Sequence, residues 1–255
     1  MQETRPAAFA KDAAFYDDGW PHEWADMKRY SPMARHTRRW IRKLLRQIPA
    51  PRSIADVGCG EGSLLAELGR LYPQARLFGA DFSEVSVCTS RRRIPRGTFA
   101  VSDVRDPQPP FDEAVDVAVI SEVLEHVDED QKAIANLAKW CRHLIVTVPG
   151  GRLDELAERM GHLRHFDVPM LRERAERGGF DVLFCRAWGA PFAYPLYARL
   201  RNRAGYATVT ASYGLAKRMV SHGLYALFYL NDFFPGGNKV FLLGRSRQLA
   251  GDGGN

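Results

Sequence analysis

The sequence predicts an α/β fold, a doubly wound sheet of mostly parallel strands covered by helices on both faces. Apolar and β-branched runs recur along the chain with helical patterns between most of them, and this alternation is typical of a parallel sheet. A glycine-rich turn follows the first run, at the place where such sheets bind nucleotide-like ligands. The 255 residues, 45% of them hydrophobic, are enough for one large core. We therefore expect a single domain over residues 1–255.

The predicted elements follow in order along the chain. Six strands are expected at 53–57, 76–80, 98–102, 115–120, 143–148 and 180–185. The run from Lys239 to Gly244 supplies a seventh, within a last-strand segment at 239–246. A helix from Glu61 to about Tyr72 is expected directly after the first strand. The cofactor-binding core is accordingly placed at 49–186.

Two segments lie outside this core. Residues 11–48 precede the first strand and contain Ser31-Pro32, a typical helix start, followed by an apolar stripe that begins at Trp40. We expect this segment to form a helical cap over the ligand cleft. Residues 187–238 join the last two strands, where a hairpin of about 2–5 residues would suffice. We expect a structured lid there.

The lid is rich in aromatic residues and has a helical period from about Gly214 to Leu230. Its apolar positions can share one broad face: Leu215, Met219, Leu224, Leu227 and Phe228. That face either packs on the sheet or lines a pocket for an apolar or aromatic substrate, and both can hold at once. A basic, aromatic helix of this kind can also touch a membrane surface or a lipid-linked substrate.

Composition narrows the class of protein. The net charge of +6 is carried mostly by 29 Arg against 7 Lys, with clusters at 35–46, 91–93 and 199–203 that either bind phosphates or form solvated helix faces. The four cysteines lack C-x-x-C spacing, which indicates buried thiols in a reducing compartment. No apolar run reaches the roughly 18 residues of a membrane span, and the N-terminus lacks a signal segment. A soluble, cytoplasmic protein is expected.

The glycine turn has the pattern D-x-G-x-G-x-G, at Asp56, Gly58, Gly60 and Gly62. Residues without a β-carbon let the backbone approach a ligand closely, although a tight turn alone has the same pattern. A dinucleotide fingerprint would need glycine at position 63, where this chain has serine. Glu61 at the positive end of the next helix would repel a pyrophosphate and tolerate a cation. The turn therefore favours an adenosine that carries a sulfonium.

These residues resemble the first motif of the class I S-adenosylmethionine-dependent methyltransferases. The resemblance implies a Rossmann-like, seven-stranded sheet in the order 3-2-1-4-5-7-6 and S-adenosylmethionine as cofactor. The lid at 187–238 would then be a helical insertion between strands 6 and 7. Asp81 is placed to accept hydrogen bonds from the ribose, and Ser102-Asp103-Val104 resembles the motif that meets the adenine. Helix or turn capping is the alternative role of the two acids. The expected cofactor-binding residues are Asp56, Gly58, Cys59, Gly60, Asp81, Phe82, Asp103, Val104 and Ser121.

The end of the fourth strand separates the subclasses of this family. Methyltransferases that act on base amino groups have (D/N/S)-P-P-(Y/F/W) there, whereas this chain has Ser121-Glu-Val-Leu-Glu-His126. Cytosine C5 methylation needs a cysteine nucleophile, typically after proline, and none of the four cysteines follows a proline. Only the arginine clusters support a nucleic-acid partner, which is therefore disfavoured. A small-molecule acceptor is favoured.

The motif E-x-x-E-H at 122–126, followed by histidines in 161–166, resembles two groups of O-methyltransferases, those of ubiquinone biosynthesis and those that methylate the terminal 2′-hydroxyl of small RNAs. In that case Glu122, Glu125 and His126 would hold Mg²⁺ or Mn²⁺. The motif also occurs in methyltransferases without a metal, where it orders the loop. Without a metal, one base often suffices, and His126 is the first candidate, before His162 and His165. Loop packing is the alternative for the last two.

We therefore expect a methyltransferase that moves a methyl group to a hydroxyl or amine of a small, apolar or aromatic molecule. Two alternatives stay open. One is metal-assisted O-methylation of an RNA 2′-hydroxyl or a polyprenyl quinol. The other is an S-adenosylmethionine-binding protein without catalysis.

Overall fold

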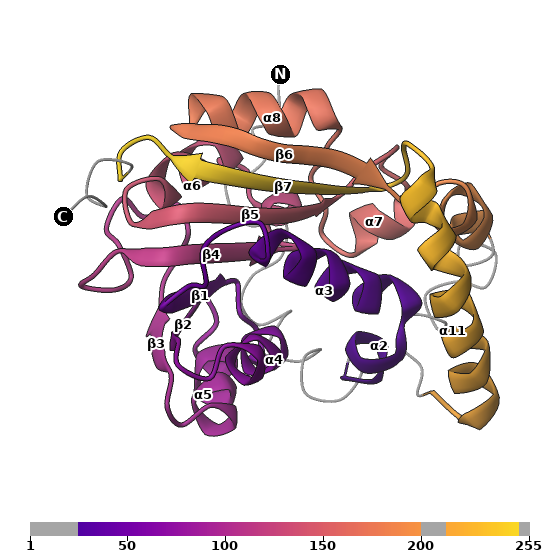
Figure 1. The fold of residues 1–255 in the computed structure, drawn as a ribbon, viewed down its shortest axis with the longest axis horizontal. Helices are drawn as coiled ribbons and strands as arrows, with labels where there is room; N and C mark the ends of the chain where they lie inside the picture. The colour runs from indigo at the N-terminus through magenta and orange to yellow at the C-terminus, as the bar shows by residue number, and fades with distance from the viewer. Residues whose placement is uncertain (1–24, 200–212, 250–255) are drawn as a thin grey trace, which may run out of the picture.

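The computed structural model describes residues 25–199 and 213–249 and confirms the predicted fold. Seven strands form one sheet in the order β3-β2-β1-β4-β5-β7-β6 (Figure 1). The strands are β1 Ser53–Val57, β2 Arg76–Asp81, β3 Thr98–Val101, β4 Val115–Ser121, β5 Cys141–Pro149, β6 Phe180–Trp188 and β7 Lys239–Ser246. β1 to β5 pair in parallel, and β7 runs antiparallel to both β5 and β6.

Two strands extend further than the sequence pattern predicts, because both pair with β7 along most of its length. β5 begins at Cys141 and ends at Pro149, which lies opposite Lys239 of β7. β6 continues to Trp188, whose partner is also Lys239. The connection between the last two strands therefore begins at Gly189 rather than at residue 187.

Helices cover both faces of the sheet. They are α2 Ala25–Tyr30, α3 Pro32–Leu45, α4 Ser63–Leu71, α5 Glu84–Arg93, α6 Asp130–Leu137, α7 Glu155–Arg159, α8 Val168–Arg177 and α11 Leu215–Leu227. Shorter turns are η1 Leu124–His126, η2 Phe192–Tyr197 and η3 Phe228–Phe233. α3 begins at the predicted Ser31-Pro32, with Pro32 in its first turn, where the missing N–H costs nothing.

Alternate residues of the central strands enter two separate cores, as expected for a doubly wound sheet. Ala55 and Val57 of β1 belong to a core that includes α6 and α8. Ile54 of the same strand belongs to a second core that includes α3 and α4. Both faces of β1 are thereby buried. This burial fixes the position of the loop that follows the strand.

The described parts of the cap and the lid are bonded to each other. Nε2 of His36 on α3 lies 2.9 Å from the carbonyl oxygen of Tyr225 on α11. Arg39 on α3 donates two hydrogen bonds of 2.7 Å to the carboxylate of Asp232 in η3. Asp232 also accepts one of 2.8 Å from the indole of Trp188. Residues 11–24 of the predicted cap and 200–212 of the predicted lid lie outside the described residues.

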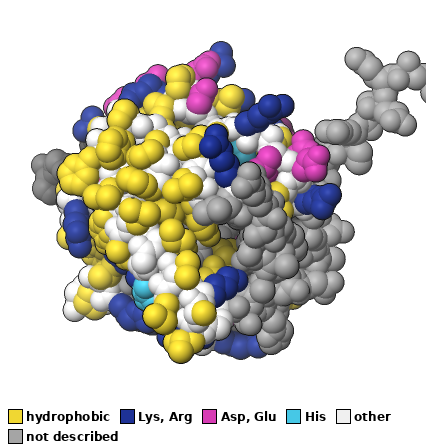
Figure 2. Space-filling model, turned by 90° about the vertical axis from the view of Figure 1, so that its right-hand side faces the viewer, with side chains coloured by type: hydrophobic (Ala, Val, Ile, Leu, Met, Phe, Trp, Pro, Cys, Tyr) yellow, Lys and Arg dark blue, Asp and Glu magenta, His cyan; other side chains and the backbone are white. Residues whose placement is uncertain are grey.

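The lid helix α11 presents its apolar residues differently from the prediction of one shared face. Phe228 is fully buried and Leu224 is partly buried in the core under the lid. Leu215 and Met219, however, are 78% and 68% exposed. α11 packs on α3 along one side only. Leu215 and Met219 lie on the opposite side of the helix from Leu224, because an α-helix has 3.6 residues per turn, and so they face solvent. Figure 2 views the molecule from this side and shows hydrophobic side chains at the surface.

Within the described ranges, no helix has the length and apolar character that crossing a bilayer takes. The four cysteines have no disulfide partner, as the absence of C-x-x-C spacing predicts.

Candidate functional site

The loops after the parallel strands lie side by side at one edge of the sheet. Val57 at the end of β1 pairs with Ala80 of β2 and Ile120 of β4, and Ser121 at the end of β4 pairs with Thr147 of β5. The residues that follow these strands therefore share one edge. In Figure 1 this edge is on the right, where α2, α7 and α11 also lie.

The loop between β1 and α4 needs its glycines. Gly58, Gly60 and Gly62 all have positive φ values, of 72°, 54° and 76°. A β-carbon on Gly58 would lie 2.3 Å from Cγ2 of Val123, and one on Gly62 would lie 2.7 Å from Oγ of Ser90. Conformation and space therefore both require glycine at Gly58 and Gly62, where Val123 and Ser90 pack against the backbone.

Asp81 lies at the end of β2 and holds this glycine loop. One carboxylate oxygen accepts a hydrogen bond of 2.8 Å from the Gly60 N–H, and the other accepts one of 3.0 Å from the Ser83 N–H. Ser83 in turn caps α5 by accepting a hydrogen bond from the Ser86 N–H. Asp81 therefore supports the turn that contains Ser83 and also fixes the glycine loop beside it.

Asp56 and Lys28 place two ionisable groups at the base of the same loop. Burial raises the pKa of Asp56 to about 8, although Lys28 opposes this shift. Burial likewise lowers the pKa of Lys28 to about 8, against the attraction of Glu61. The Lys28 ammonium lies 3.1 Å from Glu61, which also pairs with Arg93 at 2.7 Å. The charge of Glu61 is thus balanced by two cations, so it repels a phosphate less than the sequence suggested.

Cys59 and Phe82 have different relations to the loop. The Cys59 thiol is buried in the core, 3.8 Å from Oγ of Ser90, and burial raises its pKa. Its side chain therefore faces the core, and only its backbone belongs to the ligand loop. Phe82 is half-buried directly after Asp81, where its ring could cover an adenine.

Asp103 follows β3 and is paired with an arginine that the sequence motifs did not single out. Nη2 of Arg105 lies 2.6 Å from its carboxylate, and Nη1 reaches Asp128 at 3.0 Å. Asn136 donates a hydrogen bond of 2.9 Å to the carbonyl of Arg105, which fixes the loop that contains Val104. The loop after β3 is therefore held from α6, with the Asp103 carboxylate at its start.

The end of β4 carries a chain of hydrogen bonds. Oγ of Ser121 lies 2.8 Å from Oγ1 of Thr147, which donates a hydrogen bond of 2.9 Å to Glu122. The other carboxylate oxygen of Glu122 pairs with Lys239 of β7. Glu122 has a φ of 59°, which is rare for a residue with a side chain. Its carboxylate is thus turned toward β5 and β7.

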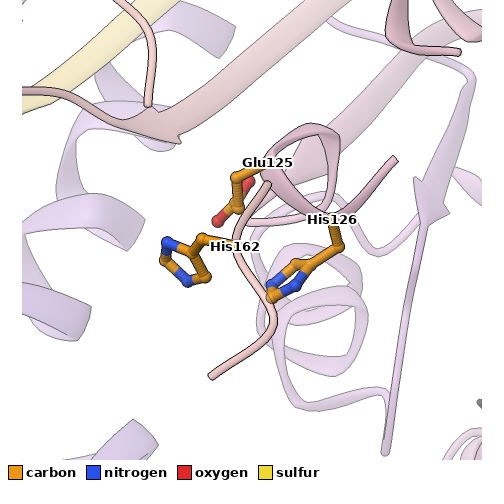
Figure 3. Close-up of side chains that lie close together, drawn as sticks. All are labelled: Glu125, His126 and His162. Atoms are coloured by element: carbon orange, nitrogen blue, oxygen red, sulfur yellow. The ribbon is translucent and has the colours of Figure 1, made fainter. Parts of the chain in front are cut away.

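Glu125, His126 and His162 form a compact cluster (Figure 3). Their candidate ligand atoms all lie within 4.8 Å of one another. Glu125 is completely buried, and neither carboxylate oxygen has a hydrogen-bond partner among the described residues. Burial, with help from the nearby Glu122, raises the pKa of Glu125 well above its ordinary value. Burial therefore favours the neutral form of this carboxyl group.

The histidines of the cluster are held by specific contacts. Nδ1 of His126 lies 3.1 Å from the carbonyl oxygen of Gly161. A carbonyl can only accept, so Nδ1 carries the hydrogen and Nε2 is the basic nitrogen of the neutral ring. Nδ1 of His162 lies 3.0 Å from Nε2 of His165, and burial lowers the pKa of His165. The segment between α7 and α8 is not helical, so His162 and His165 meet through this direct contact and not on a helical face.

The cluster differs from the predicted metal-ligand set in one member, because Glu122 is turned away and His162 takes its place. Two imidazoles and one carboxyl group can act in two ways. Nε2 of His126 can take a proton from an acceptor, or the three groups can bind a divalent ion once Glu125 has lost its proton. The position of His162 depends on the fold of 151–167, which no short motif encodes.

The sequence of this chain is similar to known proteins mainly in the region that contains the candidate site. A family model described as a methyltransferase domain matches residues 54–144, from β1 into β5. The trans-aconitate 2-methyltransferase of Acidovorax sp. (strain JS42) is 36% identical over 89 residues, which are 34% of each chain. The enzyme of that name from Rhodopseudomonas palustris (strain BisB18) is 32% identical over 159 residues, 60% of each chain. The chain thus spans between about one third and three fifths of these two relatives.

Solved structures share the fold over nearly the whole chain. The N-methyltransferase NodS from Bradyrhizobium japonicum WM9, in complex with S-adenosyl-L-homocysteine, superposes with a TM-score of 0.61 and 14% identity, covering 94% of this chain and 100% of NodS. The [4+2]-cyclase SpnF gives 0.63 and 19%, covering 94% and 98%. Since a cyclase is among these structures, the fold alone does not define the reaction.

Proposed function

We propose, on the premise that this chain is a class I S-adenosylmethionine-dependent methyltransferase, that it moves the methyl group of this cofactor to a hydroxyl or amine of a small, apolar or aromatic molecule. The observation that carries the proposal is the carboxylate of Asp81 beside Gly60, at the edge where the glycine loop opens. Acids at the ends of three neighbouring strands, Asp56, Asp81 and Asp103, surround that loop.

The residues at this edge match the parts of the cofactor. Asp81 is proposed to accept hydrogen bonds from the ribose, with Phe82 over the adenine and Asp103 and Val104 at its edge. Asp56 and Lys28 lie close enough to shift each other's pKa. Both are polar, ionisable groups, so they are proposed to meet the amino and carboxylate groups of the methionine part. The glycine loop gives the backbone room for the adenosine.

The chain's own groups would then prepare the acceptor. The bound cofactor supplies a methyl group on a positively charged sulfur, which is already activated for displacement. The protein must align the acceptor and remove its proton. His126 is proposed as the base, because the contact of Nδ1 with Gly161 leaves Nε2 as the basic nitrogen. His162, 4.8 Å away between ring centroids, holds the neighbouring side of the site.

The names of the relatives suggest a carboxylate acceptor as the competing possibility. A carboxylate is already ionised at neutral pH and needs no base, whereas a hydroxyl or amine must lose a proton. His126, which follows β4, therefore favours an acceptor that must lose a proton, a hydroxyl or an amine. The family match ends at residue 144, before the lid, so it carries little information on the acceptor pocket.

A panel of acceptors with the His126→Gln variant tests the proposal. Consumption of the cofactor with a phenol, a polyketide-like alcohol or an aromatic amine, lowered at least about a hundredfold in the variant, supports a base-assisted transfer. Rapid transfer to trans-aconitate that is unaffected in the variant would favour the carboxylate acceptor. Binding of the cofactor with no transfer to any of the three acceptor classes would favour a binding protein.

Metal-assisted O-methylation is the second candidate, and the cluster of Glu125, His126 and His162 favours it. One carboxylate and two imidazoles suit Mn²⁺ better than Mg²⁺, which prefers oxygen ligands. A bound ion would lower the pKa of an acceptor hydroxyl. Since Glu125 must lose its proton first, metal affinity should rise with pH. Turnover that survives dialysis against a chelator would eliminate this candidate.

A further inference from the structure

We propose that the outer face of the lid docks on an anionic lipid bilayer. This inference goes beyond the proposed function, because it concerns a surface outside the cofactor site. The outer lid face consists of five exposed apolar side chains on α11 and η3: Leu215, Met219, Val220, Leu230 and Phe233. Their exposed fractions are 78%, 68%, 62%, 45% and 81%.

The face is continuous along the helix rather than a scatter of single residues. In a helix of 3.6 residues per turn, Leu215, Met219, Gly223 and Ala226 follow one another on the outer side. All four are exposed, and a β-carbon on Gly223 would meet no atom within 4 Å. This exposed row of α11 is therefore apolar, and the exposed Arg218 and His222 border it on one side. Figure 2 shows the hydrophobic surface on this side of the molecule.

The charge of the lid is one-sided. Residues 189–238 contain five Lys or Arg and a single acid, Asp232, which pairs with Arg39 of α3. This segment therefore supplies a net charge of +4 of the chain's +6. Within the described part, Lys217 and Arg218 belong to α11 itself. Arg218 donates a hydrogen bond of 2.7 Å to the Tyr213 carbonyl, and Lys217 lies 3.9 Å from the Tyr213 ring.

A bilayer surface fits this combination better than the other two partners. Exposed aliphatic and aromatic side chains are stabilised when they are buried at the edge of the acyl region. Nearby cations are attracted to anionic headgroups. The phosphates of a nucleic acid would attract the cations, but they would offer no apolar contact to Leu215, Met219 and Phe233. A second copy of the lid would bring two like-charged surfaces together. α11 has 13 residues, so it would lie along the surface and not cross it.

Vesicle flotation of the full chain tests the proposal. The probe is phosphatidylcholine vesicles with and without phosphatidylglycerol. We expect binding to the anionic vesicles that weakens as salt is raised, and weaker binding to the neutral ones. The double variant Leu215→Glu/Met219→Glu should lower the partition coefficient at least about tenfold. Lys217→Ala/Arg218→Ala should lower it by about fivefold per charge on anionic vesicles only.

The control is Leu71→Glu, since Leu71 is 49% exposed at the end of α4 and outside the lid. It should bind vesicles like the unchanged protein, and circular dichroism should show that all variants are folded. Three results would overturn the proposal: no binding to anionic vesicles, equal loss in the control and lid variants, or vesicle binding that the lid variants retain. A concentration-dependent dimer or tight binding of single-stranded RNA, with no vesicle binding, would assign the face to the other partners.

Discussion

The Lys28 ammonium lies 3.1 Å from the Glu61 carboxylate and joins the cap to the cofactor loop. Both side chains are largely buried, and they come from segments 33 residues apart. The contact places a cation of helix α2 beside the glycine loop and next to Asp56. The cap is therefore in direct contact with the glycine loop through this ion pair.

Replacing Lys28 should weaken cofactor binding. Lys28→Met removes the partner of Glu61 at the loop and the cation proposed for the cofactor carboxylate, and a hydrogen bond to a charged group contributes about 1.5–3 kcal/mol. We expect the dissociation constant for S-adenosylhomocysteine, measured by calorimetry, to rise at least about tenfold. Lys28→Arg should retain most of the affinity. Unchanged binding by Lys28→Met would remove the cap from the site.

Asp81→Asn should separate the ligand role of Asp81 from its structural role. Asparagine keeps one carbonyl oxygen for the loop N–H groups but loses the charge that strengthens bonds to the ribose. The affinity for S-adenosylhomocysteine is expected to fall roughly ten- to hundredfold, with a smaller loss of thermal stability. The matched control is Asp112→Asn, because Asp112 is exposed. Equal affinities of the two variants would contradict a ribose contact at Asp81.

Gly58→Ala should destabilise the fold and close the loop. The new methyl would lie 2.3 Å from Val123, at a φ of 72°. Together, the strained backbone and the overlap should cost roughly 2–4 kcal/mol of unfolding free energy in urea. Adding Val123→Ala should recover only the part due to overlap. Gly223→Ala, which meets open space, should not destabilise; a loss equal to that of Gly58→Ala would show that the explanation is wrong.

His36 should make the stability depend on pH. Nε2 donates to the Tyr225 carbonyl and Nδ1 accepts from Arg39, so the buried ring is satisfied when neutral. Burial lowers the pKa of His36 to about 4 from 6.5. Between these values the unfolded chain binds the extra proton, so stability falls as the pH drops from 6.5 to 4, by up to about 3 kcal/mol.

Urea unfolding at pH 7 and pH 4.5 measures this dependence. His36→Gln does not titrate and should flatten the part of the curve that is due to His36. His222→Gln changes an exposed histidine and should keep the full dependence. If His36→Gln retained it as well, other groups would be responsible.

The sequence predicted most of the sheet because local patterns encode it. Buried strands such as Ser53–Val57 need apolar residues on both faces, and the resemblance of the glycine loop carried the strand order. The lid was predicted less well. Periodicity identified α11, but it could not distinguish the side that meets α3 from the side that carries Leu215 and Met219, since both sides are apolar.

The candidate site also contains residues that the sequence could place and residues that it could not. Residues at strand ends, such as Asp81, could be placed from their spacing after the strands. Lys28, Arg105 and His162 come from other parts of the chain, and only the packing of the cap, the loop after β3 and the segment before α8 brings them into the site. Glu122 belongs to a predicted motif, yet its backbone conformation and Lys239 turn its carboxylate elsewhere.

Calorimetric titration of the protein with S-adenosylmethionine, S-adenosylhomocysteine and NAD⁺ tests the central claim most directly. Among the described residues, acids and a glycine loop lie at the ends of β1 and β2, a pattern that favours a sulfonium cofactor over a pyrophosphate. We predict saturable binding of both sulfur compounds at one site per chain, and no binding of NAD⁺ at the same concentrations. Binding of NAD⁺ without binding of either sulfur compound would contradict the account.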